Sequence, residues 1–233
     1  MRRVVCNEWG EPETLVVEEV PDPEPGPGQV VVAVAAAGVN FVDALFVAGT
    51  YQIKVPPPFT PGSELAGTVT AVGDGVTGVA VGDRVLSSLG LGAFASHVVL
   101  SEAAVVPIPD NLSDGAAAVL VQSYCTAWFA LTRRTTVAPG EKVLVLGAGG
   151  GVGLAAIDVA RALGAEVIAA ASTREKLDLA AAVGAAATIA YEEEDLKARA
   201  RELSGGGVDV VVDPVGGAHT EAALRALGVG GRL

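Results

Sequence analysis

The pattern of apolar and polar residues changes near residue 115 of the 233-residue chain. Before that point, short Val-rich runs are separated by Gly and Pro, a pattern typical of β-strands and turns. We expect strands at 30–34, 64–72 and 95–100. The proline-rich segments 21–29 and 55–62 predict a turn and an irregular extended loop, because proline cannot donate to a strand ladder. The first part of the chain is therefore predicted to be mostly β, as a partly open barrel.

After residue 115, strand-like runs alternate with stretches of helical periodicity. The expected strands are 142–147, 166–171, 187–191 and 208–213, and the expected helices are 153–164, 174–184, 192–204 and 217–228. Four strand–helix units in series predict a parallel sheet with helices on both faces. These strands are apolar throughout, as expected when both faces are covered. The predicted fold class is α/β, with a β-rich domain at 1–114 and a doubly wound domain at 115–233.

Composition and charge limit the kinds of molecule that this protein is expected to bind. Apolar residues make up 51% of the chain and charged residues only 18%, so a sizeable core is available. The formal net charge is -12. An acidic surface repels phosphate backbones and anionic lipids. We therefore expect neither nucleic acid nor membrane as the main partner.

Cysteine use and the apolar segments predict a soluble cytoplasmic protein. Cys6 and Cys125 lie far apart in no metal-like spacing, which favours a reducing compartment. The start of the chain, MRRVVCNEWG, lacks the apolar run of a signal peptide. The most apolar window, 116–131, includes polar residues and falls short of the ~20 apolar residues of a membrane span.

A glycine cluster follows the first strand of the second domain, where 143–153 reads VLVLGAGGGVG. At a strand-to-helix turn, unpaired N–H groups and the helix dipole suit a pyrophosphate. The dinucleotide-binding fingerprint G-x-G-x-x-G fits 148–153, with Ala in the first Gly position. The alternative is a flexible turn that binds nothing. The residues predicted to contact the pyrophosphate are Ala148, Gly150, Gly151, Val152 and Gly153.

The residues after the second expected strand of this domain, 166–171, indicate which dinucleotide is bound. NAD sites usually carry Asp or Glu there, but this chain has small hydroxyl residues and cations. A 2′-phosphate would be stabilised by such groups, which favours NADPH. The alternative is that the two cations only solvate the start of a helix. The predicted phosphate-side residues are Ser172, Thr173, Arg174 and Lys176.

Several motifs together resemble the zinc-free, zeta-crystallin-like quinone oxidoreductases of the medium-chain dehydrogenase/reductase superfamily. They are AAGVNFVDAL at 36–45, PGSELAGTVTAVGDGV at 61–76, VGDRV at 81–85, QSYCTAWFAL at 122–131, GAGGGVGLAAIDVARALGA at 147–165, STREK at 172–176, AYEEEDL at 190–196 and VDVVVDPVGG at 208–217. The resemblance implies a chaperonin-10-like substrate domain joined to a Rossmann domain, with the active site in the cleft between them. It also implies that Lys176 and Tyr191 hold the adenosine 2′-phosphate, and that the full-length form is a homodimer.

The zinc ligands of related alcohol dehydrogenases are missing from this sequence. Their Cys, His and Cys positions correspond to Asn40, Ser63 and Gln122, none of which supplies a thiolate or imidazole. We therefore expect no metal. His97, in a predicted strand, and His219, at the start of a predicted helix, are interpreted as structural residues.

Without a metal, a quinone or an activated enone is a more suitable hydride acceptor than an alcohol or aldehyde. The catalytic candidates are Asn40, Asp43 and Tyr51. Asn40 is expected to donate to the acceptor or the nicotinamide ribose, Asp43 to orient its loop, and Tyr51 to line the quinone pocket as a donor. The alternative for each is an ordinary loop hydrogen bond. Gln122 and Thr126 are expected on the nicotinamide side.

The sequence departs from the family at two points. Leu45 and Val47 stand where many members carry Tyr and Arg, which predicts a more apolar pocket. The family also continues into a fifth strand, a sixth strand and a final segment, all expected beyond Leu233. The sequence therefore predicts a fragment or truncated product, whose own activity stays open.

Three functions remain compatible with these observations. The first is an NADPH-dependent quinone oxidoreductase that transfers hydride without a metal. The second is an enoyl-thioester or enone reductase of the same superfamily. The third is a non-catalytic NADPH-binding protein with a structural, sensing or RNA-associated role.

Overall fold

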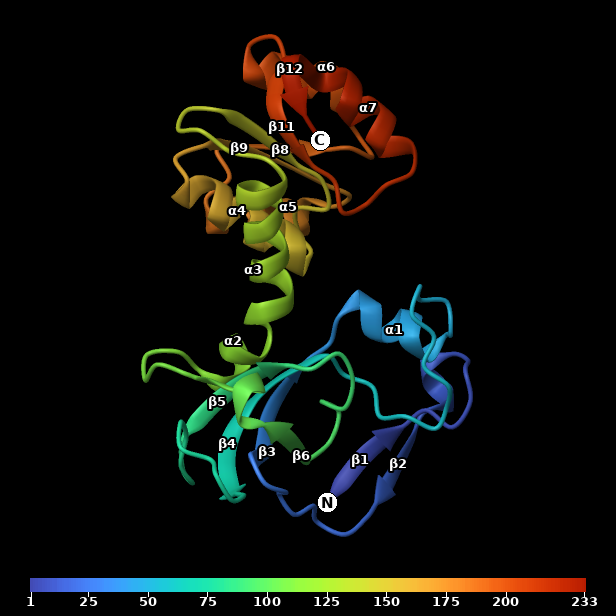
Figure 1. The fold of residues 1–233 in the computed structure, drawn as a ribbon. Coiled ribbons are helices and arrows are strands. Elements are labelled where there is room, and N and C mark those ends of the chain that lie inside the picture. The colour runs from blue at the N-terminus through green and yellow to red at the C-terminus, as the bar shows by residue number, and fades with distance from the viewer. The chain divides into compact units, whose positions relative to one another are not determined.

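The computed structural model describes residues 1–233, which form two compact units, Met1–Gln122 and Ser123–Leu233 (Figure 1). Each unit has hydrophobic cores made only of its own residues. The division falls within helix α3 (Leu120–Phe129), whereas the sequence predicted a boundary after residue 114.

The first unit is built on an antiparallel sheet with the strand order β6-β3-β4-β5-β7, accompanied by the strand pair β1-β2. The strands are β1 (Arg2–Val5), β2 (Val16–Glu19), β3 (Gln29–Gly38), β4 (Glu64–Val72), β5 (Arg84–Ser88), β6 (His97–Ser101) and β7 (Val106–Pro107), and the helices are α1 (Phe41–Val47) and α2 (Asp114–Ala118). The strands predicted at 30–34, 64–72 and 95–100 correspond to β3, β4 and β6.

The pairing of β3 with β4 places the predicted catalytic segment. The strands run antiparallel, and Gly38 at the end of β3 lies opposite Glu64 at the start of β4. Alternate residues of β3, such as Val30 and Val32, are fully buried in the core. The chain that leaves β3 therefore passes directly beside the start of β4.

Helix α1 was not predicted, because Asp43 was expected in a loop. The helix begins after Asn40, whose backbone N–H donates to the Asp43 carboxylate at 2.8 Å. This contact satisfies one of the donors that the start of a helix would leave open. Asp43 therefore lies in the first turn of a helix, where its carboxylate accepts the Asn40 N–H.

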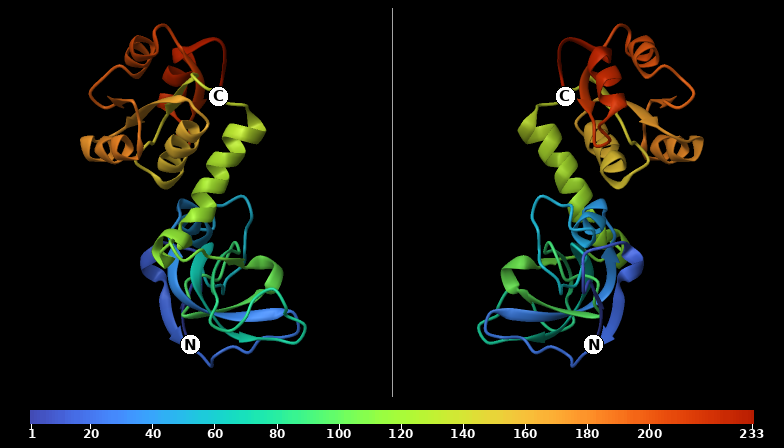
Figure 2. Two further views of the ribbon diagram at one scale, coloured as in Figure 1. Left: turned by 90° about the vertical axis from the view of Figure 1, so that its left-hand side faces the viewer. Right: turned by 90° about the vertical axis from the view of Figure 1, so that its right-hand side faces the viewer.

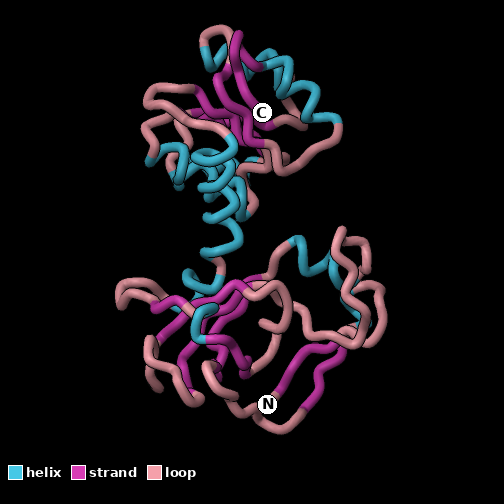
Figure 3. Tube along the Cα trace, viewed as in Figure 1, coloured by secondary structure: helices cyan, strands magenta, loops and turns pink.

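The second unit contains a parallel sheet with the strand order β10-β9-β8-β11-β12 (Figure 3). The strands are β8 (Lys142–Val145), β9 (Glu166–Ala171), β10 (Ala187–Ala190), β11 (Val208–Val212) and β12 (Leu227–Arg232), and the helices are α3, α4 (Gly151–Ala162), α5 (Arg174–Val183), α6 (Leu196–Ser204) and α7 (Ala218–Ala226). No helix in either unit combines the length and the apolar character needed to cross a membrane.

Successive residues from Val143 to Leu146 pack alternately into two different hydrophobic cores. Val143 and Val145 pack with α4, whereas Leu144 and Leu146 pack with α6 and α7. The ribbons of these helices lie on opposite faces of the sheet (Figure 2). This explains why the strand is apolar from Val143 onward. The predicted α/β fold class is thereby confirmed. The chain proceeds from β8 to β9 and β10 on one side and to β11 and β12 on the other, so the order reverses at β8, where such folds bind ligands.

Two element predictions in this unit were wrong. The fifth strand was expected beyond Leu233, but β12 already occupies 227–232 and pairs with β11. The glycine-rich sequence concealed this strand. A Cβ on Gly207 would lie 2.6 Å from Gly228 Cα, so the close approach of the chain at Gly228 requires glycine at position 207. The helix expected from residue 192 begins at Leu196, because Asp195 caps it by accepting the Ala198 N–H.

Candidate cofactor and substrate sites

The glycine cluster forms the turn between β8 and α4, as predicted. The turn is fixed to the sheet by backbone hydrogen bonds, in which Leu146 donates to Val212 and Ala148 donates to Ala170. Ala148 is fully buried and its N–H is occupied. It therefore supports the turn, as does the Gly150 N–H, which donates to the Gly147 carbonyl at 2.9 Å.

No side chain caps the start of α4. Helices α5 and α6 begin with Thr173 and Asp195 as capping acceptors, whereas α4 begins with Gly150. The N–H groups of its first turn are therefore left for an anion. Gly151, Val152 and Gly153 supply these groups.

The space around this turn fits a dinucleotide backbone. A Cβ on Gly153 would lie 2.3 Å from the Gly147 carbonyl oxygen, so helix and strand can pack only if this residue is glycine. A Cβ on Gly150 would meet only the Gly147 carbonyl oxygen, at an ordinary contact distance of 3.4 Å. These are the two roles that the fingerprint assigns to glycines, close packing and close approach of a pyrophosphate.

Lys176 lies beside the glycine turn. Its Nζ donates to Ser172 Oγ at 3.2 Å, and its side-chain stem covers Gly149. No carboxylate lies within ion-pairing distance of its ammonium group. Tyr191 is close by along the sheet edge, because Ala190 pairs with Ala171 and the Tyr191 N–H donates to the Ala171 carbonyl at 3.3 Å. Ser172 and Lys176 are thus joined by a hydrogen bond, and the backbone of Tyr191 lies beside the end of β9 that leads into Ser172.

Thr173 and Arg174 have other partners in the structure. Thr173 Oγ1 caps α5 by accepting the Lys176 N–H. The Arg174 guanidinium lies 2.6 Å from the Glu193 carboxylate, which raises the pKa of Arg174. Of the neighbouring glutamates, Glu194 pairs with Arg199 at 3.3 Å, and Glu192 lies 3.9 Å from His219 Nε2. The acidic segment 192–194 therefore supplies an ion-pair partner to Arg174 but none to Lys176, whose ammonium group stays available to a ligand.

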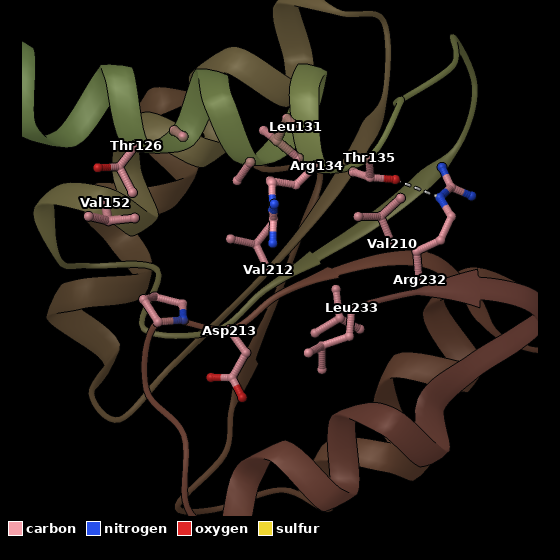
Figure 4. Close-up of a pocket in the computed structure, with 14 residues that line it drawn as sticks. Thr126, Leu131, Arg134, Thr135, Val152, Val210, Val212, Asp213, Arg232 and Leu233 are labelled. Carbon is pink, nitrogen blue, oxygen red and sulfur yellow. Dashed lines mark hydrogen bonds between the residues drawn. The ribbon is translucent and has the colours of Figure 1, made fainter.

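A mainly apolar pocket of about 290 Å³ lies against β11 and includes two predicted cofactor residues, Thr126 and Val152 (Figure 4). In Figure 4 these two lie at one end, and the hydrogen bond from Arg232 Nε to Thr135 Oγ1, 2.9 Å long, lies at the other. The Asp213 carboxylate also lines the pocket. Burial raises its pKa, but hydrogen bonds from Thr220, Gly216 and Val215 outweigh burial and hold the pKa below its ordinary value.

A polar cluster in the first unit surrounds Asn40. Its side-chain amide donates to Glu64 Oε1 at 2.9 Å and to Ser63 Oγ at 3.4 Å. The other Glu64 oxygen accepts the backbone N–H of Gln122 at 2.9 Å. Asp43, Ser63 and Glu64 are all buried, and burial raises the pKa of Asp43 although the Asn40 N–H, Ser63 and Gly62 lower it. The Asn40 amide is thus directed into this cluster.

A cavity of about 410 Å³ opens beside the cluster in the same unit. Tyr51 lines it, tilted against Phe46 with the ring centroids 4.7 Å apart. Its lining residues are Phe41, Val42, Leu45, Phe46, Tyr51, Ile53, Ser63, Gly90 and Gln122. Leu45 belongs to this lining, whereas Val47 is buried in the core. Tyr51 and Gln122 therefore share a cavity, while Asn40 and Asp43 lie outside its lining.

Sequence reasoning missed Glu64 and the contact of His219 with Tyr191. Glu64 was considered only as part of the Gly-Ser-Glu motif, although a carboxylate at the start of an apolar strand indicates a buried, hydrogen-bonded group. His219 was interpreted as structural, but its ring packs on Tyr191 with the centroids 4.2 Å apart. No sequence spacing indicates this contact, because the two residues belong to different strand–helix loops.

Two family models match this chain. The alcohol dehydrogenase GroES-like domain matches residues 26–110, and the zinc-binding dehydrogenase model matches residues 151–233. A quinone oxidoreductase-like protein 2 homolog from Nematostella vectensis is 43% identical over 236 residues, covering 100% of this chain and 64% of that protein. The chain thus spans about two thirds of the length of this relative.

Solved structures show the same fold. The Escherichia coli quinone oxidoreductase complexed with NADPH has a TM-score of 0.89 at 34% identity, covering 98% of this chain and 70% of that one. A structure described as an NAD-dependent alcohol dehydrogenase has a TM-score of 0.95 at 39% identity, covering 100% and 76%. The chain therefore belongs to the quinone oxidoreductase-like family of the medium-chain dehydrogenase/reductase superfamily, and the predicted family is confirmed.

Proposed function

We propose that this protein is an NADPH-dependent quinone oxidoreductase that transfers hydride to a quinone without a metal ion. The observation that carries the choice of NADPH is the unpaired ammonium group of Lys176 beside Ser172, with Tyr191 at the adjacent strand end. A charged donor with no carboxylate partner suits a phosphate better than a ribose hydroxyl.

The chain offers groups for each part of the cofactor. The open amides of Gly151 to Gly153 would hold the pyrophosphate, and Gly150 leaves room for it. Thr126 and Val152 would contact the nicotinamide side. Bound NADPH supplies the hydride, and the protein contributes the orientation of donor and acceptor.

The cavity lined by Tyr51 suits a flat apolar acceptor. Its walls are mostly apolar, and the Tyr51 hydroxyl offers a hydrogen-bond donor for the oxygen on which charge develops. Asn40 and Asp43 would act by positioning, since Asn40 is bonded to Glu64 and Asp43 holds the start of α1. A quinone needs no metal to accept hydride, because its conjugated system delocalises the charge. The positions that hold zinc in related alcohol dehydrogenases carry Asn40, Ser63 and Gln122 here.

A second candidate, an NAD-dependent alcohol dehydrogenase, is favoured by the similarity to the structure of that description. Against it, no carboxylate directly follows β9 to bind the ribose hydroxyls of NAD.

The experiment that tests the proposed function is oxidation of NADPH by the protein with 1,4-benzoquinone or 9,10-phenanthrenequinone as acceptor. Turnover with a quinone, faster with NADPH than with NADH, is expected. No turnover with either quinone would contradict the proposal. Reduction of apolar enones alone would favour an enone reductase, and tight NADPH binding without reduction of any acceptor would favour a binding protein.

A further inference from the structure

Ser63 is a buried serine that borders the acceptor cavity of the first unit. It directly precedes β4 and is 1% exposed, and its Oγ lies 3.4 Å from the side-chain amide nitrogen of Asn40. It also lines the cavity of about 410 Å³ that Tyr51 lines. Asn40 itself lies outside that lining. Ser63 therefore connects the polar cluster around Asn40 with the cavity.

Glu64 sets the direction of the hydrogen bonds at Ser63. Its Oε1 lies 2.9 Å from Asn40 Nδ2, and its Oε2 accepts the backbone N–H of Gln122 at 2.9 Å. A carboxylate oxygen accepts and an amide NH2 donates, so the NH2 of Asn40 faces Glu64. The same NH2 donates to Ser63, whose oxygen is therefore the acceptor in that contact. The O–H hydrogen of Ser63 is left to donate to another group.

Asp43 is the alternative acceptor for this hydrogen within the protein. Burial raises the pKa of Asp43 and Ser63 lowers it, so the two side chains are close. However, Asp43 Oδ2 already accepts the backbone N–H of Asn40 at 2.8 Å, and Oδ1 is buried without a hydrogen-bond partner. Because Oδ1 is not bonded to Ser63, the hydroxyl can rotate toward an oxygen in the cavity.

We propose that the Ser63 hydroxyl donates a hydrogen bond to a carbonyl oxygen of the acceptor, in addition to the donor that Tyr51 offers. The inference rests on the proposed function, because it takes this cavity as the acceptor site. No charged side chain lines the cavity, so the ligand is a neutral, flat molecule with carbonyl oxygens. A quinone has two such oxygens, so the two donors need not share one. Since Ser63 is buried, its hydrogen bond is little weakened by water and strengthens as negative charge develops on the oxygen.

Binding of duroquinone, the fully methylated 1,4-benzoquinone, tests the donor without any reaction. Its methyl groups block addition of the exposed Cys125 thiol, and durene is the matching hydrocarbon without oxygens. In calorimetric titrations, Ser63→Ala should weaken duroquinone binding about threefold to tenfold, the contribution of one hydrogen bond. Durene binding should stay within about twofold, because durene accepts no hydrogen bond.

Ser87→Ala is the matched control for the loss of a buried hydroxyl. Ser87 belongs to β5, is 1% exposed like Ser63, and donates to the Ala104 carbonyl at 2.7 Å instead of lining the cavity. The variant should leave both affinities within about twofold of the wild type.

Turnover is the second measurement. With NADPH and 9,10-phenanthrenequinone, Ser63→Ala should lower kcat at least about tenfold, because the missing donor acts on charge that develops during hydride transfer. NADPH affinity should stay within about twofold, and Ser87→Ala should keep the kcat of the wild type.

Unchanged duroquinone affinity in Ser63→Ala would overturn the inference, and so would a wild type that does not bind duroquinone. An equal loss for duroquinone and durene would overturn it as well, because only the shape of the cavity would then have changed. Weaker binding with an unchanged kcat would overturn the role of Ser63 in hydride transfer. Failure of the proposed function is a different result, in which the wild type binds duroquinone but oxidises NADPH with no quinone. The two titrations would then still decide whether Ser63 donates to the ligand.

Discussion

The Arg174 guanidinium lies 2.6 Å from the carboxylate of Glu193, a residue 19 positions further along the chain. This pair explains why only one of the two predicted cations is available to a phosphate. Glu193→Gln should release Arg174 and raise NADPH affinity roughly twofold to fivefold, as expected for one exposed charge. NADH affinity, measured by the same titration, should not change. A weaker affinity for NADPH in this variant would show that the ion pair between Arg174 and Glu193 is needed to maintain the structure of the site.

Two glycines in one turn should respond differently to alanine. Gly150→Ala is expected to fold, since a Cβ there makes only an ordinary van der Waals contact. Its unfolding free energy should fall by about 0.5–1 kcal/mol, because alanine is a poorer helix cap. The same Cβ would occupy the pyrophosphate space, so NADPH and NADH should both bind at least about tenfold more weakly.

Gly153→Ala is the matched control within the same helix. Its Cβ would collide with the Gly147 carbonyl oxygen, and the unfolding free energy should fall by about 1–3 kcal/mol. Thermal unfolding and cofactor titration of both variants separate the two roles. Unchanged cofactor binding in Gly150→Ala would exclude the pyrophosphate from this turn.

Tyr51→Phe tests the acceptor cavity. The ring keeps its contact with Phe46, and only the hydroxyl donor is lost. Quinone turnover should fall about tenfold or more, because a donor to the developing oxyanion is removed. NADPH affinity should not change, since Tyr51 lines a cavity formed entirely by the first unit. Turnover equal to that of the wild type would show that the Tyr51 hydroxyl does not contribute to hydride transfer.

Asp43 should make the stability of the first unit depend on pH. Burial raises its pKa in the folded state above the ordinary 3.8, so its contribution is fully present below that value. This contribution is lost as pH rises through the folded-state pKa. Asp43→Asn keeps an oxygen acceptor for the Asn40 N–H without the charge, and it should flatten this part of the pH profile of the unfolding free energy.

Near neutral pH, Asp43→Asn should be at least as stable as the wild type in denaturant titrations. A loss of more than about 1 kcal/mol there would mean that the buried charge itself stabilises the fold.

Much of the second unit could be predicted from sequence because local signals agree with the tertiary structure. Val143 to Val145 form an apolar strand, the glycines stop it, and the helix that follows is apolar on the face that packs. Contacts between distant segments could not be predicted. Arg174 meets Glu193 because the neighbouring strands β9 and β10 end at the same edge of the sheet. Tyr191 meets His219 at that edge although the strands that precede them, β10 and β11, are separated by β9 and β8.

In the first unit the sequence identified the residues around Asn40 but not their arrangement. The antiparallel register that sets Gly38 opposite Glu64 turns the Asn40 amide toward a buried carboxylate. Helix α1 is too short for a clear periodic signal, and its start depends on the hydrogen bond between Asn40 and Asp43.

The affinities of wild-type protein and Lys176→Ala for NADPH and NADH test the central claim most directly. Loss of an unpaired ammonium group that contacts a phosphate should weaken NADPH binding at least about tenfold and leave NADH binding within about twofold. An equal loss for both cofactors, or no loss for either, would contradict the claim that Lys176 binds the 2′-phosphate of NADPH.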